Sequence, residues 1–344
     1  MSETEKKPTY MEIAEKTGIS SATISRVVTG ASNVKEETRR RVLFALEEHG
    51  FNTADIIERE RARGERFGRP VIFNIPTMAN PFYSQIIFGA KSAAVRHGYR
   101  LLINEEHING NTIDSIINLV QSVNAAGLIL TNFAETAYLK KLSSVIPLVQ
   151  CCEYDATLNI PYVSIDDIAA AHTVMDYLFS LGRRRIAFIN GPIRYKYARH
   201  RLQGYTEALE EAGIGMKADL IIQLPEINYD MAVSAVTQLL NTHQADDAPD
   251  AIFCVSDVFA AASIKAASRL GFSVPGGLVI TGFDNIEIAG MISPSITTID
   301  QPRFQIGFSG TEILAERIAN PSAPARGILL ETSLIVREST RRQG

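Results

Sequence analysis

Residues 8–51 read PTYMEIAEKTGISSATISRVVTGASNVKEETRRRVLFALEEHGF, a stretch that predicts three short helices and no strand. Thr9 can cap the first helix with its hydroxyl, and Gly18 can end that helix in a left-handed turn. Ser20 can cap the second helix, over residues 21–28. Two short helices joined by a tight glycine turn predict a helix-turn-helix, whose second helix can enter the major groove of DNA.

A third helix is expected over residues 36–48, ending before Gly50. Glu12 has the spacing to complete a capping box with Thr9. Apolar residues fall on one face of each helix, which predicts a small shared core. The residues expected to face inward are Ile13, Ala14, Thr17, Ile24, Val27, Val28, Val42, Leu43 and Leu46. On these residues alone, an ordinary helical hairpin is an open alternative to a DNA-binding unit.

The other side of the second helix carries small or cationic residues, so its first turn could come close to base edges. Arg26 could pair with two acceptors of a guanine or hold a phosphate. The basic run Arg39–Arg41 either adds positive charge to this surface or forms a solvated face paired with Glu36 and Glu37. The candidate DNA-binding residues are Thr9, Tyr10, Ser20, Ser21, Ala22, Thr23, Ser25, Arg26, Thr29 and Asn33.

From Val71 to about Ser339 the pattern changes, because short apolar runs such as VIFNI, GLILT and AIFCV alternate with helical segments. Strand–helix alternation at this spacing predicts an α/β fold of parallel sheets with helices on both faces. The runs suffice for one sheet or for two smaller ones. Residues 53–69 are highly charged and poor in large apolar side chains, which predicts a linker between the two regions.

The composition is that of a globular protein of 344 residues, 46% hydrophobic and 21% charged, which is enough for two to three domains. The net charge of −4 does not settle whether nucleic acid is a partner. Three cysteines, two of them adjacent, fit neither a disulfide framework nor a spaced zinc site, so we expect a reducing compartment. Without a membrane-length apolar run or a secretory signal, we expect a cytoplasmic protein.

Catalytic motifs are not found in the sequence. The stretch GFSG at 307–310 lacks the final glycine of a G-x-S-x-G elbow. The glycines at 213–215 follow a helical segment and precede a strand, whereas a dinucleotide fingerprint follows a strand and opens a helix. We therefore expect no enzyme activity, no catalytic residue, no cofactor and no metal ligands.

The N-terminal stretch closely resembles the headpiece of the lactose/galactose repressor family, through I-A-x-x-x-G-I-S, T-I-S-R-V and V-x-x-x-T-R-x-x-V. The resemblance continues in YARHRLQGYTEAL, VSDVFAAASIKAASRLGFSVPGGLVITGFDN and SITTIDQPRFQIG. Within the family, FDNI and LIVRESTR are most similar to nucleoside-responsive members. The resemblance implies a headpiece, a hinge, and a two-lobed domain like that of periplasmic binding proteins.

The implied divisions are a headpiece over 1–52, a hinge over 53–69, and an effector-binding and dimerisation domain over 70–340. The implied lobes are about 70–164 with 302–327, and about 165–301 with 328–340. The hinge departs from the family, because Glu60 stands where most members carry the leucine that enters the minor groove. A carboxylate there cannot replace an apolar wedge, so we expect a loose tether that bends DNA little. Ile56 or Ile57 could take the place of the leucine only if the helix register shifted.

The resemblance places a small molecule between the lobes, at the carboxyl ends of the strands. Asp284 could accept from vicinal hydroxyls, Arg199 could donate to ligand oxygens, and Phe82 or Tyr195 could stack on a flat ligand. The implied effector-binding residues are Thr77, Phe82, Glu153, Tyr195, Arg199, Ser256 and Asp284. Asp284 and Asp257 have helix capping as an alternative role.

The expected function is a homodimeric repressor that binds double-stranded operator DNA under the control of a sugar or nucleoside. Because residues 70–340 alone look like a solute-binding protein, that function is the alternative. The N-terminal helix-turn-helix pattern argues against it.

Overall fold

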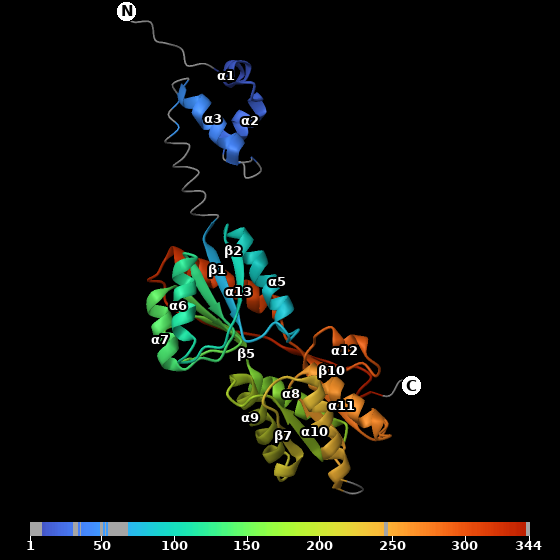
Figure 1. Cartoon of the computed structure of the whole chain (residues 1–344). Coiled ribbons are helices and arrows are strands. Elements are labelled where there is room, and N and C mark those ends of the chain that lie inside the picture. Colours follow the sequence, from blue (N-terminus) through green and yellow to red (C-terminus); the bar gives the residue numbers. More distant parts are fainter. Residues whose placement is uncertain are drawn as a thin grey trace, which may run out of the picture. The chain divides into compact units, whose positions relative to one another are not determined.

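The structure is a computed structural model that describes residues 9–29, 34, 36–48, 51, 53, 68–243 and 247–341. The chain divides near Pro70 into two compact units, each of which is described by itself (Figure 1). Most of the predicted hinge, Glu60 included, lies outside the described residues, and so does Asn33. None of the helices in the described ranges is long and apolar enough to span a membrane.

The first unit contains the three predicted helices, which are α1 (Tyr10–Thr17), α2 (Ser21–Val28) and α3 (Glu36–Glu48). Gly18 adopts φ +66° after α1, a conformation that favours glycine, so α1 ends there as predicted. Ser20 caps α2, because its hydroxyl accepts from the Thr23 backbone N–H at 3.2 Å. The Glu12 side chain lies outside the described part of the structure, so the capping box stays a prediction.

A single apolar core joins these helices. Its buried residues are Ile13, Ile19, Ile24, Val27, Val42, Ala45 and Leu46, with Ala14, Val28, Leu43 and Phe51 packed at its edge. The helical periodicity of the sequence predicted most of this set, because residues three and four apart share a helix face.

The second unit is built on two six-stranded sheets, which confirms the expected fold class. The first sheet contains β1 (Pro70–Ile75), β2 (Arg100–Glu105), β3 (Gly127–Leu130), β4 (Leu148–Cys151), β5 (Tyr162–Ile165) and β11 (Gly327–Leu330), in the order β11-β5-β4-β3-β1-β2. The second contains β6 (Ile186–Asn190), β7 (Ile221–Gln223), β8 (Ala251–Cys254), β9 (Val279–Asp284), β10 (Thr297–Asp300) and β12 (Ser333–Ile335), in the order β12-β10-β9-β8-β6-β7. In the second sheet β12 pairs antiparallel to β10, whereas the other strands pair in parallel.

Helices cover both faces of the first sheet (Figure 1). They are α5 (Tyr83–Arg96), α6 (Ile113–Ser122), α7 (Thr136–Val145) and α13 (Arg303–Ala319). Leu148 of β4 belongs to the core formed with α6 and α7, while its neighbour Val149 faces α13, because successive strand residues point to opposite faces. Gly89 of α5 and Gly307 of α13 let these helices approach closely, since a Cβ atom at either would overlap the other backbone.

The second sheet carries the remaining helices, with α8 packed on α9 and α10 on α11. They are α8 (Asp167–Ser180), α9 (Lys196–Glu211), α10 (Tyr229–Thr242), α11 (Asp257–Arg269) and α12 (Ile288–Met291), with the 3-10 turn η1 (Ala218–Leu220). We call the first sheet with its helices lobe one and the second with its helices lobe two.

The chain passes between the lobes three times: after β5, between β10 and α13, and between β11 and β12. The change of lobe expected at about residue 327 lies in β11, which pairs with β5 of lobe one as far as Leu330. Ile165, its partner, likewise belongs to lobe one. Two short apolar runs, GILL and SLI, follow each other closely here, and hydropathy alone does not show which sheet each joins.

Candidate functional site

A cavity of about 650 Å³ lies between the two lobes. Most of its polar residues follow or end strands of both sheets, as expected for open parallel sheets, whose ligands lie at the carboxyl ends. Six of the seven implied effector-binding residues line it, namely Thr77, Phe82, Glu153, Tyr195, Ser256 and Asp284.

Asp284, the last residue of β9, is held in the cavity wall by two side chains of lobe two. Gln301 Nε2 donates to Asp284 Oδ1 at 2.6 Å, and the Arg201 guanidinium lies 3.5 Å from the same oxygen. Burial raises the pKa of Asp284 to about 6, against the opposing influence of Arg201. Asp284 does not occupy the capping position of α12, which is Glu287.

The expected placement of Arg199 in this cavity is wrong. Arg199 is exposed, and its guanidinium donates to the Ile193 carbonyl at 3.1 Å. Arg201 lines the cavity instead: its Nε donates to Asp167 Oδ1 at 2.9 Å, and a terminal nitrogen donates to the Val255 carbonyl at 2.6 Å. Two residues along a helix are rotated by about 200°, so the two arginines point to nearly opposite sides of α9.

Asp167 at the start of α8 joins the two buried cations of this region. Its carboxylate accepts from Arg201 and, at 2.5 Å, from Lys196 Nζ. Burial opposes ionisation of Asp167, but the two adjacent cations outweigh it and hold the pKa of Asp167 below its usual value. All three side chains are therefore charged and paired, which a buried charge requires.

Aromatic rings from both lobes supply the apolar part of the cavity. Phe82 and Tyr83 of lobe one meet edge to face, with ring centres 5.2 Å apart. Tyr195 and Tyr197 of lobe two stack at 5.6 Å, and the Arg194 guanidinium lies 5.0 Å from the Tyr195 ring. Such rings can hold a flat or apolar ligand face.

Glu153, in lobe one just after β4, contacts the main chain of lobe two. Its Oε2 accepts from the Lys196 backbone N–H at 2.7 Å, and its Oε1 accepts from that of Tyr197 at 3.4 Å. Burial raises the pKa of Glu153 to about 7, although these bonds and the Lys196 ammonium act in the opposite direction. A second cavity of about 720 Å³ shares Glu153 and also contains Arg199.

Two other predicted residues make local bonds at the cavity edge. The Thr77 hydroxyl accepts from the Ala79 N–H at 3.1 Å, and the Ser256 hydroxyl caps α11 by accepting from the Phe259 N–H at 3.3 Å. Asp257 does not line the cavity and does not make the capping bond of α11. Its Oδ2 accepts instead from the Ile286 N–H at 2.8 Å.

The adjacent cysteines differ in position. Cys151 is fully buried in β4, whereas Cys152 is half-buried and lines the cavity. Burial raises the pKa of both thiols, that of Cys151 to about 12, so both favour the unreactive thiol form.

In the first unit, one side of α2 is exposed and carries small or cationic residues. Ser21, Ala22, Ser25 and Arg26 lie on this side, opposite the buried Ile24. The remaining predicted DNA-binding residues that the structure describes are exposed, apart from the half-buried Thr23; they are Thr9, Tyr10, Ser20 and Thr29.

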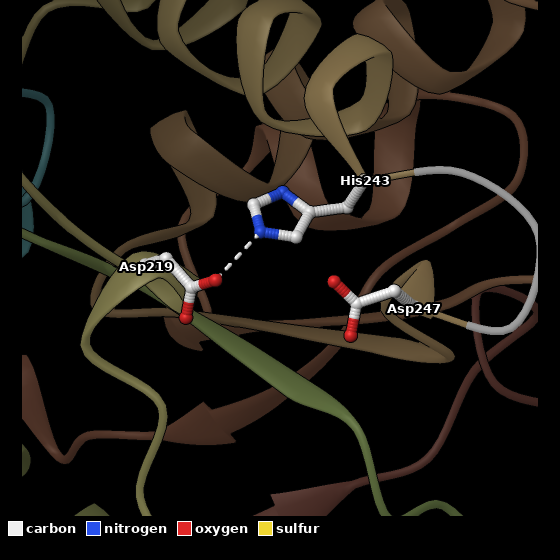
Figure 2. Close-up of side chains that lie close together, drawn as sticks. All are labelled: Asp219, His243 and Asp247. Carbon is white, nitrogen blue, oxygen red and sulfur yellow. Dashed lines mark hydrogen bonds and ion pairs between the residues drawn. The ribbon is translucent and has the colours of Figure 1, made fainter.

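Three side chains gather elsewhere in lobe two, where the exposed Asp219 and Asp247 flank the buried His243 (Figure 2). His243 Nε2 lies 3.0 Å from Asp219 Oδ2, and its Nδ1 lies 3.1 Å from the Leu239 carbonyl. The third member, Asp247, accepts from Lys217 Nζ at 2.7 Å. The hydrogen bond to Asp219 raises the pKa of His243. Each carboxylate therefore has its own partner, the His243 ring for Asp219 and the Lys217 ammonium for Asp247, which accounts for the cluster as two separate side-chain pairs.

Comparison with known proteins relates the whole chain to bacterial regulators. Residues 9–54 match the model of bacterial regulatory proteins of the lacI family, and residues 175–340 match that of a periplasmic binding protein-like domain. The HTH-type transcriptional repressor CytR of Escherichia coli strain K12 is 32% identical over 335 residues, which are 97% of this chain and 96% of that repressor.

Solved structures give the same picture. The complex of the transcriptional regulator CelR with cellobiose is 26% identical with a TM-score of 0.71, over 96% of this chain and 99% of that chain. The Lac repressor dimer bound to operator and the anti-inducer ONPF, 22% identical, shares the fold with a TM-score of 0.73, over 97% of this chain and 99% of that chain. The chain therefore belongs to the lacI family of bacterial regulatory proteins, a family of DNA-binding transcriptional repressors.

Proposed function

We propose that this protein is a cytoplasmic, homodimeric repressor whose affinity for operator DNA changes when a sugar or nucleoside occupies the cavity between the lobes. One observation carries the proposal: a helix-turn-helix with an exposed polar second helix is joined to a unit whose two lobes enclose a polar and aromatic cavity. The solute-binding alternative does not account for the helix-turn-helix, which matches the lacI family.

Operator recognition is assigned to α2. Short hydroxyl side chains let the helix approach base edges, and Arg26 adds a charged donor. A homodimer presents two such helices, so its operator is a pseudo-palindrome with two half-sites. In this proposal the unit from Pro70 onward supplies both effector binding and dimer contacts.

Effector recognition is assigned to the cavity, which offers the two kinds of contact that a nucleoside or sugar needs. Asp284, Arg201 and Gln301 present oriented acceptors and donors for hydroxyl groups. Phe82 and Tyr195 offer ring faces for the apolar side of the ligand. The cavity holds no recognised catalytic constellation, and we assign the protein no enzyme activity.

Regulation follows from differential binding to two states of the lobes. A ligand that contacts both lobes favours the closed arrangement. It can change the binding free energy for DNA only by as much as its own binding free energy differs between the closed and open states. The direction of the change in operator affinity is measured by adding the identified ligand to the DNA-binding assay.

Two measurements test the proposal. Selection from a random duplex pool, followed by fluorescence anisotropy at fixed salt, should yield a pseudo-palindromic operator. A thermal-shift series with nucleosides and sugars should identify the ligand, because a molecule that binds only the folded state raises stability; adding it to the anisotropy assay gives the sign.

Matched variants locate the DNA-binding face. Ser25→Glu places a carboxylate on the exposed side of α2 and should abolish operator binding by repulsion from phosphates. Ser180→Glu introduces the same charge at an exposed helical serine of lobe two and should leave it unchanged. Equal behaviour of the two variants would contradict the assignment.

A further inference from the structure

The first turn of α9 has no capping side chain of its own lobe. Tyr195 occupies the N-cap position and makes no side-chain capping bond. Helix α8 in the same lobe differs, because Asp166 accepts from the Ile168 and Ala169 N–H groups at 3.1 and 3.0 Å. The initial N–H groups of a helix have no partner within the helix and need an external acceptor.

Glu153 of lobe one supplies that acceptor across the cavity. Its two oxygens accept from the first two N–H groups of α9, those of Lys196 and Tyr197. The carboxyl group is buried, with 5% of the residue exposed. The positive end of the helix dipole stabilises an acceptor in this position.

A second contact between the lobes lies beside the first. The ring of Tyr154, the residue after Glu153, lies 5.0 Å from Lys196 Nζ, which also pairs with Asp167 of lobe two. Lobe one therefore holds the start of α9 at both its main chain and its first side chain.

We propose that Glu153 is a latch between the lobes, which completes α9 in the closed arrangement, rather than a residue that binds the effector. The inference rests on the proposed function, since it assigns one step of its regulation. Both oxygens of Glu153 are engaged by α9, and the same helix carries Arg201 into the cavity. Opening the lobes removes the Glu153 acceptor from the first turn of α9. The separation of the lobes is therefore coupled to the order of α9, which forms part of the cavity wall.

Hydrogen exchange of the full-length protein, without ligand or DNA, tests the latch directly. Glu153→Met keeps the volume of the side chain but removes its acceptors, so a peptide containing Lys196 and Tyr197 should exchange about tenfold faster. Glu153→Gln keeps an acceptor oxygen for Lys196 and should retain most of the protection. Asp166→Ala, the matched control, should speed exchange at Ile168 and Ala169 only.

The outcomes separate the latch from other roles. If Glu153→Met exchanges as slowly as the parent protein at α9, Glu153 only fills the wall and the latch is refuted. The latch is also refuted if Asp166→Ala loosens α9 to the same extent. Because hydrogen exchange at α9 does not measure operator binding, the latch can fail while the proposed repressor function stands. The anisotropy assay with operator DNA can likewise fail while the latch stands.

Discussion

The two units place their polar groups in opposite ways. The described residues of the headpiece form an apolar core, and its candidate DNA-binding side chains are exposed on α2, where Arg26 lies in solvent. The second unit buries charged side chains beside its cavity, where Asp167 pairs with both Lys196 and Arg201. We therefore expect substitutions on the exposed side of α2 to affect DNA binding without lowering the stability of the headpiece. In the cavity we expect substitutions to affect ligand binding and stability together, because losing one member of a buried pair leaves a charge without a partner.

The strongest challenge to this comparison is Asp167→Ala. It leaves Lys196 and Arg201 buried without their shared carboxylate and should cost about 3–5 kcal/mol of unfolding free energy. Asp166→Ala removes only a helix cap and should cost about 1 kcal/mol. Urea unfolding of both variants measures the difference. Similar losses would show that the buried charges are not coupled.

The pH dependence of stability is the next largest effect. Burial raises the pKa of Glu153 in the folded protein to about 7. The contribution of Glu153 to the unfolding free energy is therefore fully present below its ordinary pKa and is lost as pH rises through about 7. Titratable groups around Glu153 include the buried Tyr83, Lys196 and Asp167 and the half-buried Cys152.

Glu153→Gln cannot titrate and should lack this loss, which is on the order of 3 kcal/mol. The measurement is the unfolding free energy of parent and variant at several pH values. Parallel curves would contradict the raised pKa.

Arginine substitutions in α9 sharpen the comparison within one helix. Arg201→Ala should weaken effector binding by about 2–3 kcal/mol, because it removes a charged donor from the cavity, and it should also lower stability. Arg199→Ala, on the opposite side, should change neither. Calorimetric titration with the ligand found by thermal shift gives both affinities. A loss confined to Arg199→Ala would restore the original assignment.

The smallest total effect is expected in the headpiece. Arg26→Ala should weaken specific operator binding by about 1–3 kcal/mol if it reads a base. The unfolding free energy should stay within about 0.5 kcal/mol, since the side chain is exposed. Anisotropy with operator and with random duplex distinguishes the roles, because an equal loss on both would identify a phosphate contact.

The headpiece was predictable because its information is local. Helical spacing in a short stretch determines that Ile24 and Val27 are buried and that Ser25 and Arg26 are exposed. The family resemblance indicated Asp284 as a cavity residue, and its place at the end of a parallel strand agrees with this, since such ends meet at one edge of a sheet.

The rest of the cavity depends on contacts that local spacing does not specify. Arg201 was missed, although it shares the buried face of α9 with Ala198 and Tyr205, three and four residues away, and this periodicity could have found it. Glu153 was expected to bind the effector, and only the position of lobe two shows that its oxygens meet α9. Asp167 follows a residue with the same side chain, so the sequence does not distinguish cap from ion-pair partner.

The repeated passage between the lobes has a consequence for synthesis on the ribosome. The edge strand β11 of lobe one and the edge strand β12 of lobe two are both made after almost everything they join. The fully buried Ser339, whose hydroxyl donates to the Ile280 carbonyl at 2.6 Å and accepts from the Thr297 N–H at 2.9 Å, comes later still. Neither lobe can complete its sheet until these late residues have been made. The headpiece can therefore fold early in translation, whereas both lobes must reach their final form together near its end.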